Sequence, residues 1–499
     1  MTISNIPTAM FSGRTILRTD LTDVKDAATM KAELERVLPL HTHNRQQIRM
    51  LQEYFRGYHP AVQNRVKRTR TDIDNKITVN YAKSFTRDSV GYFLGKPVQY
   101  VHRRGSYPRQ MDALRGALDA ENKALVDYQI AEDCSICGVG YRGIFSESEP
   151  RNGTPLKLLR LEPQDTFVVY SSNPIKPPVY AVSQYEMQGD TSVVTYYNVY
   201  TPTQMFVFKD ETLNGQDKLT GGELAVVSVT DINFGGNLPV VEYQNNMWRL
   251  GDWETETALM DAIDFVTSDG VNDIQQAVNS VFVALGFEMT PEAFATLSTH
   301  GFLNIANIPP SVTPKADFIS QPMNADVGVA MREFLEATLR VIVGVPDRKT
   351  RSGGGGDTGD AVFMRDGWQD IDLVATAKEP YFIQAEREAL MVMLYILDTN
   401  KQNIGSLKAT DIEIRFNRNK TANIQSKAQV YTGLTSGDAP LAPIDALDIA
   451  DLTNNEADVI MRSESFREEM RQKRITEQAE LKNDPNSKQQ GGSSVAGDE

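Results

Sequence analysis

The sequence predicts an α+β protein that is mainly helical, and three observations lead to this prediction. Short runs of alternating apolar and polar residues, broken by turn residues, fill 140–243, a pattern typical of β-strands. Apolar residues three or four positions apart recur over 252–286, 324–343 and 360–400, a spacing typical of long helices. A last helical region covers 425–482. The 499 residues are enough for several sub-domains around a sizeable core.

The region before the strands is expected to be mostly helical. A helix is predicted at 26–57, followed by a loop around His59 and Pro60. The sequence of 75–101 indicates an extended start, a helix, a turn at Gly95-Lys96-Pro97 and a strand. A helix predicted at 108–137 then leads through two glycines into the β-rich part.

The two cysteines, Cys134 and Cys137, both lie at the end of that third helix. A zinc site would need a second pair or nearby histidines, and the five histidines are scattered along the chain. We therefore favour two small residues packed in a helix over a redox pair. A disulfide scaffold is excluded, which fits assembly in a cytoplasm.

An acidic helix is predicted at 252–286, directly after a short apolar strand at 239–243. Asp252 is expected to be its N-cap. A continuous helix of this length would span roughly 50 Å. It has no basic residue, and its acidic residues mostly lie off the apolar stripe: Asp252, Glu254, Glu256, Asp261, Asp264, Asp269 and Asp273. Two interpretations stay open, a solvated face of one helix and a wall built from many copies around something anionic.

Short proline-containing elements are predicted at 287–322. A glycine-rich loop then separates the helix predicted at 324–343 from the helix predicted at 360–400. The spacing of Gly354, Gly356 and Gly359 formally matches a dinucleotide fingerprint, but the loop follows a helix and no βαβ unit surrounds it. It also lacks the Gly-Lys-Ser/Thr of a phosphate-binding P-loop.

The same loop carries basic residues just before its four glycines. Arg348, Lys349 and Arg351 precede Gly353, Gly354, Gly355 and Gly356. Such a tether suits a contact with a phosphate backbone that does not read sequence. A plain surface connector is the alternative.

The last third of the chain is predicted to be helical with one strand. Pro380 is expected to kink or divide the helix of 360–400. A strand is predicted at 411–417 and helices at 425–482, and the polar end of the chain is expected to be disordered.

The net charge of −15 is distributed unevenly along the chain. The segment 45–109 has fourteen Lys and Arg against four acids, so it carries +10 and the remainder carries −25. Such a basic segment indicates either a nucleic-acid contact or a face that pairs with acidic neighbours in the same fold or in the next subunit.

Neither a membrane protein nor an enzyme is indicated. No stretch approaches the ~20 consecutive apolar residues of a membrane span, and the N-terminal residues do not form a secretory signal. Nucleophile-elbow and HExxH motifs are absent. Asp261 and Asp264 could form a carboxylate pair, but such pairs need a metal or substrate to acquire a role. We therefore expect no catalytic residue, no cofactor and no bound metal. The competing hypothesis is an enzyme, a nuclease that holds metal ions on the acidic helix.

Several segments together resemble the SPP1-type phage portal protein family, which forms the connector ring at one vertex of a tailed-phage capsid. The matching segments cover roughly 40–420 in the expected order: NKITVNYAKSFTRDSVGYFLGKPVQYV, SICGVGYRGIF, LEPQDTFVVYSS, PVVEYQNNMWRLGDWE with LMDAIDFVTSDGVNDIQQ, and GDTGDAVFMRDGWQDID. The first 40 residues and the C-terminal part match weakly.

The resemblance implies a portal fold with long stem helices, a β-rich wing, a small α/β clip and a helical crown, assembled as a ring, usually of twelve subunits. It places these parts as follows: a partly flexible N-terminal segment at 1–45, the wing at 46–251 with 360–423, stem helix 1 at 252–286, the clip at 287–322, stem helix 2 at 323–344, the tunnel loop at 345–359, the long kinked helix and a wing strand at 360–423, the crown at 424–482 and a disordered tail at 483–499.

The resemblance also implies a function and partners. The ring would be the channel for packaging and ejecting double-stranded DNA, without sequence preference. It would bind the terminase large subunit, which supplies the ATPase, and head-completion or adaptor proteins, and it would meet major capsid and scaffold proteins. The protein would belong to the virion and assemble in the host cytoplasm. A structural ring or adaptor of the head-tail connector without DNA contact is the alternative.

The implied site has two parts. Arg348, Lys349 and Arg351 with Gly353–Gly356 would touch DNA phosphates weakly, and the loop has no aromatic residue that could stack on bases. A set of acids would line the channel and keep DNA from adhering: Glu254, Glu256, Asp261, Asp264, Asp269 and Asp273.

Overall fold

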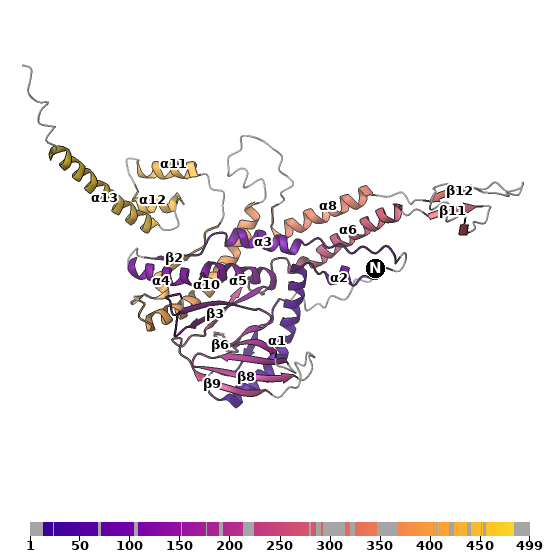
Figure 1. Ribbon diagram of the computed structural model, residues 1–499, viewed down its shortest axis with the longest axis horizontal. Helices are drawn as coiled ribbons and strands as arrows, with labels where there is room; N and C mark the ends of the chain where they lie inside the picture. Colours follow the sequence, from indigo (N-terminus) through magenta and orange to yellow (C-terminus); the bar gives the residue numbers. More distant parts are fainter. Residues whose placement is uncertain are drawn as a thin grey trace, which may run out of the picture.

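The computed structural model consists of a mixed body, from which one pair of helices projects (Figure 1). It describes residues 13–22, 24–67, 71–103, 108–150, 152–175, 177–188, 193–212, 224–278, 281–285, 291–292, 315–319, 325–346, 368–402, 404–405, 407–418, 424–436, 441–450, 452 and 456–483. Among the helices of these residues, none combines the length and apolar character needed to cross a membrane.

The centre of the body is a three-stranded antiparallel sheet covered by helices. Its strand order is β10-β3-β4. The strands are β3 (Val139–Ser146), β4 (Leu156–Leu161) and β10 (Val240–Gln244). Helices α3 (Tyr81–Phe93), α4 (Pro108–Ala120), α5 (Lys123–Cys137) and α10 (Trp368–Thr399) share its hydrophobic core. Removal of these apolar faces from water is the main force that holds the body together.

A second, larger sheet forms the lower part of the molecule in Figure 1. Its strand order is β1-β5-β6-β7-β8-β9, with β1 parallel to β5 and every other pair antiparallel. The strands are β1 (Leu17–Thr19), β5 (Thr166–Ser171), β6 (Pro178–Gln188), β7 (Val193–Tyr200), β8 (Gln204–Thr212) and β9 (Ala225–Asp231). Helix α1 (Ala27–Phe55) lies against it, with Met30, Leu34 and Val37 in the shared core. The β-rich prediction for 140–243 is therefore confirmed.

Helix α1 begins where the sequence predicts. The side chain of Asp26 accepts a hydrogen bond from the Thr29 backbone N–H at 2.9 Å, so Asp26 is the N-cap. The helix, turn and strand predicted within 75–101 are also confirmed, as α3 and β2 (Gln99–His102).

The single helix predicted at 108–137 is wrong, because the chain breaks it into α4 and α5. Asn122 has a φ of 49°, in the left-handed region, where a helix cannot continue. Asn is among the few residues that adopt this conformation readily. Cys134 and Cys137 are both buried and free in α5, as expected for small packed residues.

The projecting pair consists of α6 (Thr257–Val278) and α8 (Ala325–Val343), which pack side by side (Figure 1). A short 3-10 turn, η2 (Glu254–Glu256), precedes α6. The second helix agrees with the prediction of 324–343. The first is shorter than predicted, since it ends at Val278.

The residues predicted as the end of the first long helix form a strand instead. Strand β11 (Val281–Leu285) pairs antiparallel with β12 (Lys315–Ile319). The run Val281-Phe282-Val283 consists of β-branched and aromatic residues that suit a strand. Its apolar positions also fitted the helical spacing, and short apolar runs do not separate the two structures.

Helix α10 runs from Trp368 to Thr399 with Pro380 inside it. The helix is therefore not divided at this proline. Strand β13 (Ile412–Arg415) confirms the strand predicted at 411–417 and pairs with β2. The remaining helices are α2 (Pro60–Gln63), α11 (Ile424–Thr435), α12 (Pro443–Ile449) and α13 (Glu456–Asn483). The predicted tunnel loop and disordered tail lie outside the described residues, apart from the first two residues of that loop and the first of that tail.

Candidate functional site on the polar face of helix α6

The polar face of α6 binds an extended segment of the same chain, residues 75–79. The backbone N–H of Val79 donates to Asp264 Oδ1 at 2.7 Å, that of Ile77 to Ser268 Oγ at 3.0 Å, and that of Asn75 to Asn272 Oδ1 at 2.8 Å. Every second residue of the segment thus meets every fourth residue of the helix.

The match between segment and helix follows from their dimensions. Two residues of extended chain advance by about 6.6 Å, and four residues of helix rise by about 6 Å. The two repeats therefore stay in register over three steps. Since 75–79 has no strand partner, these side chains satisfy backbone N–H groups that would otherwise lack a partner.

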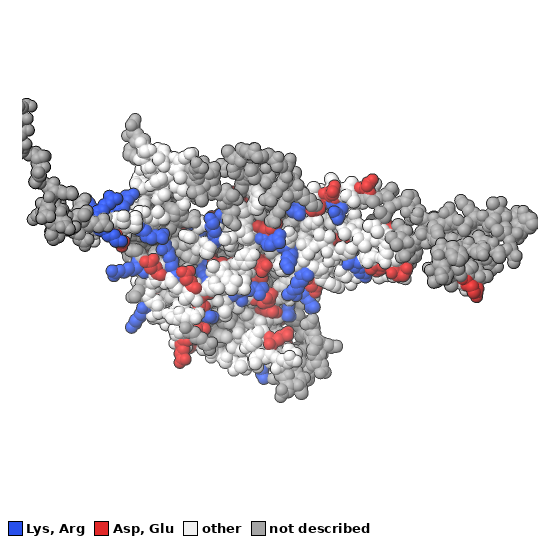
Figure 2. Space-filling model, turned by 45° about the horizontal axis from the view of Figure 1, so that its top comes forward, with Lys and Arg blue, Asp and Glu red and all other residues white. Residues whose placement is uncertain are grey.

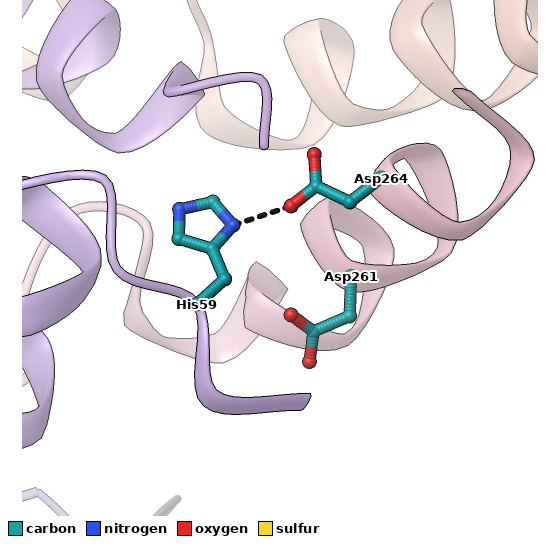
Figure 3. A group of neighbouring side chains, drawn as sticks. All are labelled: His59, Asp261 and Asp264. Atoms are coloured by element: carbon teal, nitrogen blue, oxygen red, sulfur yellow. Dashed lines mark hydrogen bonds and ion pairs between the residues drawn. The ribbon is translucent and has the colours of Figure 1, made fainter. Parts of the chain in front are cut away.

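A buried cluster of His59, Asp261 and Asp264 lies at one end of this arrangement (Figure 3). His59 Nδ1 is 2.5 Å from Asp264 Oδ2. The Tyr54 hydroxyl donates to the Asp261 carboxylate at 3.0 Å, and the Tyr54 ring stacks on the His59 ring with 4.6 Å between centroids. Burial raises the pKa of Asp261 to about 6.

Charged contacts continue along both ends of α6. The Arg65 guanidinium forms a bidentate pair with Asp269, with N–O distances of 2.8 and 3.1 Å. At the start of the helix, buried Arg14 pairs with buried Glu254. These contacts attach the residues before β1 to the start of the projecting pair and the segment after α2 to α6.

Asp252 is not the N-cap that the sequence suggests. Its side chain, 5% exposed, lies before η2. There Lys378 Nζ donates to its Oδ2 at 2.6 Å, Ser135 Oγ donates at 2.7 Å and Asn245 Nδ2 donates to its Oδ1 at 2.8 Å. Burial by itself raises the pKa of this carboxyl, but the ammonium and these donors outweigh burial and hold the pKa below its usual value.

The six acids predicted to line a channel fall into two groups. Glu254, Asp261 and Asp264 are buried within one chain and have the partners given above. Their assignment to a channel surface is therefore wrong, because a carboxylate enclosed by its own chain cannot face a lumen. Glu256 and Asp269 are partly exposed and Asp273 is exposed.

The residues predicted to contact DNA lie in the glycine-rich loop. Arg348, Lys349, Arg351 and Gly353–Gly356 lie outside the described residues, so the structure places none of them relative to α6.

Part of the basic segment 45–109 pairs within the chain. Arg65 pairs with Asp269 and Arg45 with Asp165, at N–O distances of 2.8 and 3.3 Å. Arg49 pairs with Glu53 one turn away on α1. These three arginines therefore pair with acidic residues of the same fold, which is one of the two roles expected for the basic segment.

A second buried ionic network, which the sequence did not reveal, joins α5, β3 and α10. Arg142 and Glu386 are 0% and 2% exposed, with Arg142 Nη1 2.9 Å from Glu386 Oε1. Lys123 lies 3.2 Å from Glu386 and 2.6 Å from Asp127. Burial raises the pKa of Glu386, but Arg142 and Lys123 outweigh it and hold the pKa at about 2.

One of the three comparisons with known proteins shows a family. The family model described as phage portal protein, SPP1 Gp6-like, matches residues 34–441. A search of curated proteins found no match. One similar solved chain comes from a structure described as the neck of an empty GTA particle; it is 11% identical, with coverage of 81% of this chain and 93% of that chain and a TM-score of 0.39. That likeness is too distant to add to the assignment.

The family match spans more than half of the chain and includes α6, α8, α10 and all strands of the sheets except β1. It therefore covers both the projecting pair and the elements that hold α6 through its polar face. The chain belongs to the phage portal protein family, SPP1 Gp6-like.

Proposed function

We propose that this chain forms a ring, with twelve subunits expected, at one vertex of a phage capsid, and that double-stranded DNA passes through its axial channel during packaging and ejection. The observation that carries the proposal is an apolar stripe on α8 that stays more than half exposed among the described residues. A second copy of the chain is the occupant that a closed ring provides.

The stripe follows from the spacing of four side chains on α8. Val327, Met331, Phe334 and Val341 are 68%, 51%, 65% and 75% exposed. Their separations of four, three and seven residues put them on one side of a helix. The side that packs within the chain is different and includes buried Leu339 and Val343. An apolar row of this size on a projecting helix indicates a protein contact.

The charges on the projecting pair fit a channel along which DNA moves without adhering. Figure 2 shows acidic side chains along the edges of this projection, with basic ones among them. Of the predicted wall residues, Glu256, Asp269 and Asp273 keep some exposure, and we assign the lining role to these three. Repulsion between carboxylates and phosphates is screened over about 8–10 Å at physiological salt, so it acts only near the wall.

The tunnel loop completes the proposed mechanism. A ring of loops bearing Arg348, Lys349 and Arg351, with the flexible Gly353–Gly356 behind them, would touch phosphates reversibly and without reading sequence. The motor is assigned to the terminase large subunit, since the chain contains no ATP-binding motif. Head-completion or adaptor proteins would bind the segment between α6 and α8, and the major capsid and scaffold proteins would contact the outer surface.

Imaging of the purified chain tests the ring directly. Negative-stain images are expected to show particles with an axial hole and a countable symmetry. A chain that stays monomeric at high concentration, with scaffold protein present or absent, would contradict the proposal. Detection of DNA in the lumen of assembled virions separates this function from a ring or adaptor without DNA contact.

The loop makes a separate prediction. Joint replacement of Arg348, Lys349 and Arg351 by Ala is expected to reduce DNA packaging or retention while rings form normally, because it removes three phosphate-binding charges from each subunit. Packaged DNA per particle is the measurement.

The matched control exchanges the same residues while keeping their charge: Arg348→Lys, Lys349→Arg and Arg351→Lys. This variant is expected to package like the wild type, since the contact depends on charge and not on a fixed geometry. Normal packaging by the triple Ala variant would remove the loop from the mechanism.

A further inference from the structure

The cluster of His59, Asp261 and Asp264 has the composition and spacing of a metal-ligand set. One ligand atom of each residue lies within 4.8 Å of the others, and no other group of three His, Cys, Asp or Glu side chains in the described parts of the chain meets this criterion. The two carboxylates are three residues apart on α6, and the imidazole comes from the loop that faces them (Figure 3).

Burial leaves the charge of this cluster uncompensated. All three residues are buried, His59 and Asp264 completely. Two carboxylates and one imidazole carry a net negative charge even when the imidazole is protonated. The charged groups that act on the Asp261 carboxylate are His59 and Asp264, whereas Arg65, the nearby base, is engaged by Asp269. An uncompensated buried carboxylate is costly.

Neighbouring groups orient the ligands from outside, as they do in metal sites. The Val79 N–H binds Asp264 Oδ1 and leaves Oδ2 facing the imidazole. The Tyr54 hydroxyl holds the Asp261 carboxylate while its ring holds the imidazole plane. His59 Nε2 is the exception, since it is buried and no described residue offers it a hydrogen bond.

We propose that His59 Nδ1 and one carboxylate oxygen each from Asp261 and Asp264 bind a single divalent transition-metal ion of the zinc class. On binding, a protonated His59 loses its Nδ1 proton to solvent and keeps the proton on Nε2. Nδ1 and Asp264 Oδ2, 2.5 Å apart without the ion, move apart so that each lies about 2.0–2.2 Å from it. A neutral imidazole, two carboxylates and one divalent ion sum to zero charge. An imidazole ligand favours transition metals over Ca²⁺ and Mg²⁺, which prefer oxygen ligands throughout.

The ion would fasten the loop before α2 to the projecting helix, at the end of the hydrogen-bonded segment 75–79. Its ligands come from positions 59 and 261–264, which are about two hundred residues apart in sequence. This role does not depend on ring formation or DNA contact. It revises the expectation from the sequence that the protein binds no metal.

The test uses the full-length, untagged chain, because an affinity tag of histidines would bind the probe. Protein stripped with EDTA is expected to take up one Co²⁺ per chain, with visible absorption bands that Zn²⁺ abolishes, and its thermal midpoint should rise when Zn²⁺ is restored. Asp261→Asn and His59→Gln should each weaken Co²⁺ binding at least 10-fold.

Arg65→Gln is the matched control. It breaks the Arg65–Asp269 pair on the same interface but removes no proposed ligand, so its Co²⁺ affinity should equal that of the wild type. Failure of the stripped wild-type chain to take up Co²⁺ would overturn the proposal on its own. Uptake that persists unchanged in both ligand variants would assign the ion elsewhere and would also overturn it.

Should either ligand variant fail to fold, the wild-type chain still decides the question. Zinc titration followed by NMR should shift the side-chain signals of one of the five histidines, and the shifted signals should be absent from the other ligand variant. A titration that shifts no histidine, or several equally, would contradict a site at His59.

Discussion

Replacement of Glu386 by Ala is expected to lower the free energy of unfolding by about 3–5 kcal/mol, the range for breaking a buried ion pair on one side. Arg142 and Lys123 would then share only the Asp127 carboxylate, so the buried network would carry one uncompensated positive charge. The substitution would also remove two hydrogen bonds, because the Tyr100 and Tyr243 hydroxyls donate to Glu386 at 2.7 and 2.9 Å. Urea unfolding at matched protein concentration is the measurement.

Two comparisons make this prediction specific. Asp398→Ala removes an exposed acid from the same helix, α10, and should change stability by no more than about 0.5 kcal/mol. The double change Glu386→Leu and Arg142→Met replaces charge on both sides and should cost less than Glu386→Ala. A loss below about 1 kcal/mol for Glu386→Ala would mean that water replaces the carboxylate and that the network is not sealed.

Introducing charge into the exposed stripe of α8 is expected to abolish the ring. Phe334→Glu with Val341→Glu would put two carboxylates into each proposed contact between copies, where burial of an unpaired charge costs several kcal/mol. Both side chains are more than half exposed in the single chain, so the fold of the subunit should survive. Sedimentation should show monomers or small oligomers in place of rings.

The control for this variant is Ile175→Glu, which adds one carboxylate in place of two, at an apolar residue that is 84% exposed in the turn between β5 and β6. Rings are expected to persist in it. Rings of normal size in the double α8 variant would show that this stripe faces solvent in the assembly, and the contact between copies would have to be sought elsewhere.

The sequence predicted most elements because their signals are local. The alternation within 140–243 and the four-residue spacing in 324–343 each depend on residues a few positions apart. Two predicted helices, at 108–137 and 252–286, have wrong boundaries, and each error also has a local cause. A left-handed Asn122 divides one helix, and the run 281–285 satisfies helical and strand patterns equally until its partner 315–319 is known.

The site was predicted only in part, since a polar helix face does not reveal what it contacts. The sequence marked Asp261 and Asp264 as important, but it assigned them to a channel, while the structure encloses them with Tyr54 and His59. The residues that were missed, Ser268 and Asn272, carry no charge and so attracted no attention. Their spacing from Asp264 by four and eight residues, opposite an extended segment, was the signal that could have found them.

The sequence by itself determined the α+β class, most of the helices and strands, the packed cysteines and the family. Only the tertiary structure decided which acids of α6 are enclosed and which remain exposed. The physical reason is distance along the chain. The periodicity of the sequence predicts that one face of α6 is polar, but the groups that pair with this face come from residues 54–79, about two hundred positions earlier. Folding brings these donors to the carboxylates of Asp261 and Asp264, whereas Asp273 stays exposed.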